Sequence, residues 1–232
     1  MTDTGWVALA AGAFVGTHLA LSHLLRAPLV ARLGERGFLL VHSLVAAVTL
    51  WWLVHAYRAS APTPMLWPVG DAIWAVATVV MLVASTLFVG SLVRNQALVT
   101  GGAPIAEPGA ARGVYAVTRH PMMWSFALWG GVHITVYPIA ANIVLAGAVM
   151  LLALGGAAAQ DAKKLRAEPA WRAWVARTSF VPFAAILAGR ARPGGFGAQA
   201  LGGGVVLWLA ATWAHLPLAG WAAGIWRWVY GA

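Results

Sequence analysis

The chain alternates between long apolar stretches and short polar or basic connections. Most of the apolar stretches contain about 20 residues, which is the length that a helix needs to cross a bilayer. The expected spans are residues 5–25, 37–57, 71–93, 121–136, 139–159 and 201–218. The pattern therefore predicts an all-α, polytopic membrane bundle of about six transmembrane helices.

The polar connections divide the chain further. Residues 160–192 are the most polar stretch, and within it Trp171 and Trp174 recur at helical spacing opposite the charges. This spacing predicts an amphipathic helix on the cytoplasmic membrane surface. The other connections are expected to be loops, turns or linkers, at residues 26–37, 58–68, 94–119 and 191–204. We predict a transmembrane core over residues 1–192, followed by an extra transmembrane or interfacial helix over residues 193–232.

Composition supports a membrane protein and excludes several chemistries. The chain is 61% hydrophobic and only 9% charged, too apolar for a soluble domain. It contains no cysteine, which excludes disulfides, thiolate metal ligands and cysteine nucleophiles. Its 14 tryptophans suit interfacial belts and packing around a flat ligand. The net charge of +9 sits in short loops between apolar spans, so it indicates topology and no nucleic-acid partner.

The cationic residues predict an orientation. Loops after the first, third and fifth spans hold 13 of the 15 Lys and Arg residues. The positive-inside rule then places these basic loops in the cytoplasm and both termini on the outer side. We therefore expect a multi-pass protein of an inner (plasma) membrane.

Arg119-His120-Pro121 marks the clearest candidate site, because a basic loop ends there and an apolar segment begins. Proline is well tolerated at the first position of a helix, so Pro121 is expected to begin one. The free N–H groups and the helix dipole at this end favour an anion or an electron-rich ligand beside Arg119 and His120. In the alternative interpretation, Arg119 only anchors the helix at the lipid headgroups.

Seven histidines in or beside the spans are the second candidate chemistry, because ionisable residues inside a bilayer usually face the bundle interior. His18 and His23 lie about 7.5 Å apart along one helix and point in different directions, so a shared ligand needs different helices. His23 with His42 or His120 is one candidate set, and His133 with His55 or His215 is another. Imidazoles from separate helices suit haem. For any single histidine, a hydrogen bond to a neighbouring helix is an equally good interpretation.

Several motifs resemble the NnrU family of bacterial membrane proteins, which also includes the zeta-carotene isomerase of plants and cyanobacteria. The resemblance covers almost the whole chain, and the segment after Arg190 with His215-Leu216-Pro217 resembles NnrU proteins alone. The matching motifs are Ser22-His23, Gly34 to Phe38, Thr118 to Pro121 with Trp129 and His133, Asp161 to Leu165, Arg177 to Phe183, and Ala185 to Arg190.

This resemblance implies an association with denitrification and, through the isomerase, haem b with redox-dependent isomerisation of a polyene. His23 falls at an axial-ligand position of the isomerase. The isomerase takes its other histidine ligand from the fifth helix, but residues 150–159 contain no histidine here. We expect His23 and His120 as metal ligands. The expected cofactor-binding residues are His18, His23, His42, Arg119, His120 and His133.

A more distant resemblance is to membrane methyltransferases of the isoprenylcysteine carboxyl and phospholipid types. They share an Arg-His-Pro motif that opens a helix, then a helical hairpin and a cytoplasmic amphipathic helix. In them the Arg-His pair and two acidic residues hold S-adenosylmethionine, and Gln160-Asp161 stands at the acidic position here. A third hypothesis is a non-enzymatic assembly factor. Expected partners are the lipid bilayer and a denitrification reductase or its maturation proteins.

Overall fold

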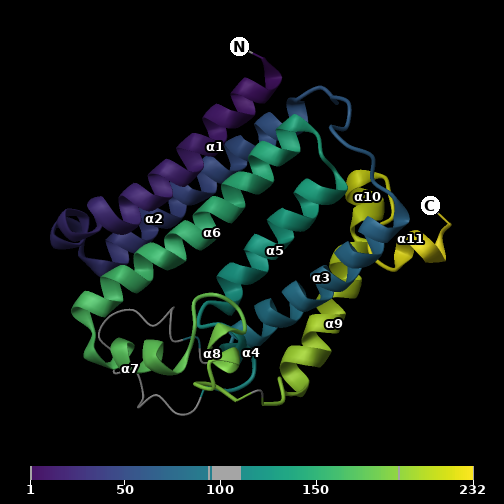
Figure 1. The fold of residues 1–232 in the computed structure, drawn as a ribbon. Coiled ribbons are helices and arrows are strands. Elements are labelled where there is room, and N and C mark those ends of the chain that lie inside the picture. The colour runs from purple at the N-terminus through teal and green to yellow at the C-terminus, as the bar shows by residue number, and fades with distance from the viewer. Residues whose placement is uncertain (1, 94, 96–110, 193, 232) are drawn as a thin grey trace. The chain divides into compact units, whose positions relative to one another are not determined.

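The computed structural model describes residues 2–93, 95, 111–192 and 194–231, and every regular element in these ranges is a helix (Figure 1). Five helical segments are long and apolar enough to cross a membrane, namely Asp3–Leu24, Arg26–Ala59, Asp71–Ser91, Ala140–Ala167 and Ala198–Ala219. The predicted all-α membrane bundle is thus confirmed. The expected fourth span is α5 (Pro121–Val136), which has 16 residues and a length of about 24 Å.

The chain forms two compact units, and α5 and α6 (Ala140–Ala167) each contribute to both. Unit 1 contains Met1–Val69 and Gly130–Ala159, and unit 2 contains Gly70–Trp129 and Gln160–Ala232. The predicted division near residue 192 stays a prediction.

In unit 1, α1 (Asp3–Leu19) and α2 (Arg26–Ala59) lie side by side with the first part of α6 (Figure 1). Their shared core contains Val7, Phe14 and Leu53, and α6 adds the small residues Ala141 and Ala148. Small side chains at the contact let membrane helices approach closely.

The prediction of a loop at residues 26–37 is wrong, because this stretch is largely helical. The short π-helix η1 (Ala20–Leu24) follows α1, and α2 begins at once with Arg26. Only Gly34 interrupts α2, with φ at +70°, a conformation that glycine adopts at low cost. Arg26 forms an ion pair with Glu35 at 2.9 Å, which bridges the interruption. Polar residues mark the end of the apolar span without ending the helix.

In unit 2, α3 (Asp71–Ser91) packs along α9 (Ala198–Trp213). A Cβ on Gly204 would lie 2.7 Å from the Thr86 Cα, and one on Gly203 would lie 2.8 Å from a Val89 methyl group. These glycines therefore lie on the side of α9 that packs closely against α3. The prediction of a linker over residues 191–204 is wrong from Ala198 onward, where α9 begins. The short helices α10 (His215–Ala219) and α11 (Trp226–Val229) complete this part of the chain.

The polar stretch after the fifth span folds as predicted in one respect and differs in another. The helix α7 (Pro169–Arg177) is amphipathic, since Trp171 and Trp174 are buried while Arg172 is exposed. However, α6 continues without a break to Ala167, eight residues beyond its expected end. Two single turns, α4 (Val114–Val117) and α8 (Ala184–Leu187), also belong to unit 2. Most of the loop predicted at residues 94–119 lies outside the described residues.

Candidate functional site

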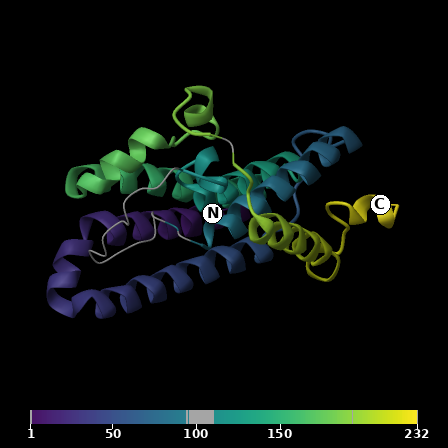
Figure 2. The same ribbon diagram turned by 90° about the horizontal axis from the view of Figure 1, so that it is seen from below.

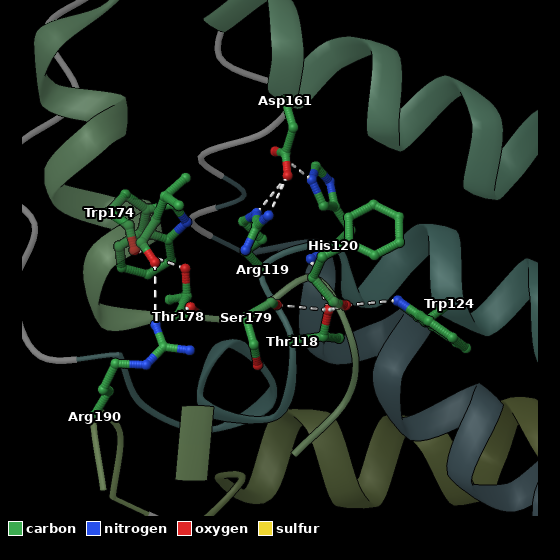
Figure 3. Close-up of polar contacts among 11 residues, drawn as sticks. Thr118, Arg119, His120, Trp124, Asp161, Trp174, Thr178, Ser179 and Arg190 are labelled. Carbon is green, nitrogen blue, oxygen red and sulfur yellow. Dashed lines mark hydrogen bonds and ion pairs between the residues drawn. The ribbon is translucent and has the colours of Figure 1, made fainter. Parts of the chain in front are cut away.

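Arg119 and His120 meet on one carboxylate in unit 2. The Arg119 Nε donates to Asp161 Oδ2 at 2.6 Å, and its Nη2 forms an ion pair with the same oxygen. The Nε2 of His120 lies 2.7 Å from Asp161 Oδ1. Figure 3 shows Asp161 reaching both side chains from the end of α6. The motif before α5 is therefore joined to a residue 41 positions further along the chain.

This cluster is shielded from water. His120 is 2% exposed and Asp161 is 6% exposed, and the Arg119 side chain is 11% exposed. Hydrogen bonds between charged groups are shorter and stronger than neutral ones, and burial reduces screening. Both oxygens of the carboxylate are used within the protein, so Asp161 compensates the Arg119 charge directly.

The imidazole of His120 keeps one nitrogen without a hydrogen-bond partner. Its Nδ1 is buried and unpaired among the described residues, while Trp171 and Phe180 pack their rings around it at centroid distances of 6.2 and 5.5 Å. In the neutral ring, a proton on Nε2 faces Asp161, and Nδ1 then presents a lone pair. This arrangement holds an acceptor nitrogen in a fixed orientation, the chemistry expected of a general base or ligand atom.

The segment after α7 holds the motif in place. Thr118 Oγ1 donates to the Phe180 carbonyl at 2.7 Å, and the Arg119 N–H donates to the Ser179 carbonyl at 2.9 Å. The Trp124 indole donates to the same Phe180 carbonyl at 2.8 Å (Figure 3). These contacts explain why Thr118 is fully buried and fix the backbone of Arg119 and His120 before α5 begins.

Aromatic residues and Lys164 close the cluster on the side of α7. The Lys164 Nζ lies 4.7 Å from the ring centroid of Trp171 and 3.8 Å from a Glu168 oxygen. The Tyr115 hydroxyl donates to the Val93 carbonyl at 3.1 Å, and burial raises the pKa of this phenol. The tyrosine therefore stays a hydrogen-bond donor at neutral pH. Sequence analysis placed Asp161 at the acidic position of the methyltransferase resemblance but did not predict its pairing with Arg119 and His120. It named Lys164 only within a motif.

A second group of candidate residues lies in unit 1, where His18 of α1 meets His42 of α2. Their ring centroids lie 4.8 Å apart at 82°, and Ser22 Oγ lies 3.1 Å from the His42 Nε2. The Nδ1 of His18 is buried and has no hydrogen-bond partner in the described part of the chain. His23 lies in η1, and π-helical turns often occur at functional sites.

The remaining histidines make contacts with other residues. His133 of α5 uses its backbone carbonyl to accept a hydrogen bond from Asn142 at 2.8 Å. His55 stacks on Trp51 in unit 1, and His215 lies beside Trp221 in unit 2. Among the described residues, no group of three or more His, Cys, Asp or Glu side chains is placed to hold a metal ion. The shared ligand sets of His23 with His42 or His120, and of His133 with His55 or His215, stay predictions.

The chain matches one family model, described as NnrU protein, over residues 6–223. No curated protein and no solved structure matches the chain. The match includes both units and every candidate residue described above.

Proposed function

The chain belongs to the NnrU family, and from this premise we propose that it binds haem b through the histidines of unit 1. The observation that carries the proposal is the contact between His18 and His42, which come from separate helices. Imidazole is the side chain that most often ligates haem iron, and this chain offers no cysteine thiolate as an alternative.

The residues present fit one axial ligand with a supporting neighbour. A metal–imidazole bond is about 2 Å long, so two rings on opposite faces of one iron would lie further apart than 4.8 Å. His18 and His42 are therefore not both ligands of one iron in this arrangement. His18 has an unpaired buried nitrogen, whereas the His42 Nε2 is engaged with Ser22. We assign His18 and His23 as ligand candidates and His42 as the neighbour that orients His18.

The surroundings suit a flat cofactor with acidic groups. Phe14 packs against His18 and Phe38 packs against His42, which supplies an aromatic wall. The Arg26 guanidinium lies 5.4 Å from the Phe38 ring centroid and is a candidate partner for a propionate. Bound haem would supply one-electron chemistry. Family membership then supports a redox or maturation role in nitrogen-oxide reduction, with polyene isomerisation as a related activity.

The absorption spectrum of the detergent-purified protein tests this proposal. We expect a Soret band in the wild type that is lost or shifted in His18→Ala and His23→Ala. His55→Ala is the matched control, because His55 lies on α2, about 20 Å along the helix from His42. A wild-type protein that stays colourless after haem is added would contradict the proposal.

A second candidate function is S-adenosylmethionine-dependent methyl transfer, favoured by the junction of Arg119 and His120 with Asp161. The membrane methyltransferases bring the equivalent Arg-His pair and acidic residues to one cofactor. Here the cofactor carboxylate would have to replace Asp161 at the Arg119 guanidinium. Calorimetry with millimolar S-adenosylmethionine tests this idea, and absence of binding by both the wild type and Asp161→Asn would exclude it.

A non-enzymatic assembly role makes a different prediction. Such a protein would co-purify with a reductase subunit and carry no pigment. Affinity purification from denitrifying cells, followed by the same absorption spectrum, separates this role from the haem proposal.

A further inference from the structure

The turn around α8 exposes large apolar side chains outside the long helices. Val181 is 58% exposed, Phe183 is 52% exposed and Leu187 is 86% exposed. In the described part of the chain, no other large apolar residue is as exposed as Leu187. These three residues lie between α7 and α9, and no helix of membrane-spanning length includes them.

The backbone holds Phe183 outward at a conformational cost. Phe183 has φ at +65°, the one positive value at a non-glycine residue in the described ranges. A side chain with a Cβ is disfavoured in this region, so the surrounding contacts must impose the conformation. The Phe183 N–H donates to the Val117 carbonyl at 2.8 Å, and the Leu187 N–H donates to the Phe183 carbonyl at 2.9 Å. The exposed ring therefore belongs to a rigid turn.

Exposed cations flank the exposed apolar residues along the chain. Arg177, Arg190 and Arg192 are exposed, and residues 177–192 contain no acidic residue. The Arg190 Nη1 donates to the Thr178 carbonyl at 2.9 Å and to the Ala176 carbonyl at 3.1 Å, which fixes its position beside the end of α7. Exposed apolar side chains flanked along the chain by exposed arginines match the boundary between acyl chains and anionic headgroups.

The turn also lies at the end of a membrane-spanning helix. Ala185 and Ala191 pack against Ala116 of α4, and Val114 of α4 packs against Gly90 near the end of α3. Figure 2 shows the yellow-green α8 turn standing out from α4 and α7, its neighbours in unit 2. The turn is therefore joined through α4 to the end of α3, a helix long enough to cross a membrane.

We propose that this turn is an interfacial anchor. Val181, Phe183 and Leu187 enter the adjacent leaflet, and the neighbouring arginines bind the phosphates of anionic phospholipids. The anchor would fix the segment that holds Thr118 and Arg119, because residues 178–183 contact both.

A chain without cysteine allows a direct test with single labels. Leu187→Cys carries a nitroxide label, and Ala173→Cys on the exposed face of α7 is the matched control. The full chain is reconstituted in vesicles of phosphatidylcholine with and without phosphatidylglycerol. We expect the label at 187 to be accessible to oxygen and protected from a water-soluble nickel chelate, at a depth of about 5–10 Å. The label at 173 should show the opposite pattern.

Three outcomes would overturn the proposal. The first is equal access of the nickel chelate to both labels in vesicles with phosphatidylglycerol. The second is protection of position 187 from both the nickel chelate and oxygen, which would identify a protein contact as the cover. The third is an unchanged depth when phosphatidylglycerol is omitted and when Arg192→Gln is introduced, which would exclude the anionic headgroup as the ligand. None of these outcomes depends on haem.

Discussion

Replacing Asp161 by asparagine removes the negative charge between Arg119 and His120 while keeping a side chain of nearly the same shape. Hydrogen bonds to charged groups contribute about 1.5–3 kcal/mol and neutral ones about 0.5–1.5 kcal/mol. Asp161 makes such contacts with two partners, so Asp161→Asn should cost about 2–3 kcal/mol. The Asp161 side chain is 8% exposed and that of Arg119 is 11% exposed, so solvent screening reduces this value little.

Asp161→Ala should cost more, about 3–5 kcal/mol, because it leaves a buried guanidinium without compensation. Thermal unfolding in detergent, followed by tryptophan fluorescence, measures both effects. A loss of 2–3 kcal/mol corresponds to a fall of about 4–12 °C in the unfolding midpoint for a chain of this size. Asp161→Glu should lower the unfolding midpoint less than either of these changes.

Glu35→Gln is the matched control, since it breaks the more exposed ion pair with Arg26. Surface pairs contribute about 0–1 kcal/mol, so this midpoint should barely move. The double variant Arg119→Gln/Asp161→Asn should cost less than the sum of the two single changes, because the charges compensate one another. If Asp161→Asn were as stable as Glu35→Gln, the buried cluster would contribute nothing to stability and the reasoning would fail.

Three further predictions concern packing and the backbone. Gly204→Ala should cost about 1–3 kcal/mol of stability and lower the unfolding midpoint, because its Cβ would meet Thr86, whereas Gly202→Ala faces open space and should be neutral or stabilising. Thr118→Val should cost about 1–3 kcal/mol, because the buried His120 N–H loses its Thr118 acceptor and the Phe180 carbonyl keeps only the Trp124 indole as a donor, and Thr118→Ser should not; the same unfolding assay compares them. Phe183→Gly should stabilise the isolated protein by up to about 1 kcal/mol through relief of its positive φ, yet make the label at 187 shallower in vesicles.

Some element boundaries followed from local chemistry alone. The helix predicted over residues 121–136 is observed as Pro121–Val136, because proline sets the first turn and Pro138 follows the end. The amphipathic pattern of residues 169–177 was equally informative, since alternating tryptophans and arginines sort onto two faces. Local composition misled at the polar start of α2, where charged residues did not end the helix, and at the glycines of α9, where packing against α3 decided the structure.

The sequence by itself determined that this protein is a helical membrane bundle, because the length and apolarity of each span depend only on neighbouring residues. It also marked Arg119, His120 and the histidines of α1 and α2 as the residues able to carry chemistry. Only the tertiary structure decided which of them meet. Asp161 reaches Arg119 across 42 positions and Ser22 reaches His42 across 20, and no local pattern encodes such distances. Helix packing brings these groups together, and it alone fixes Asp161 as the common partner of the Arg-His pair.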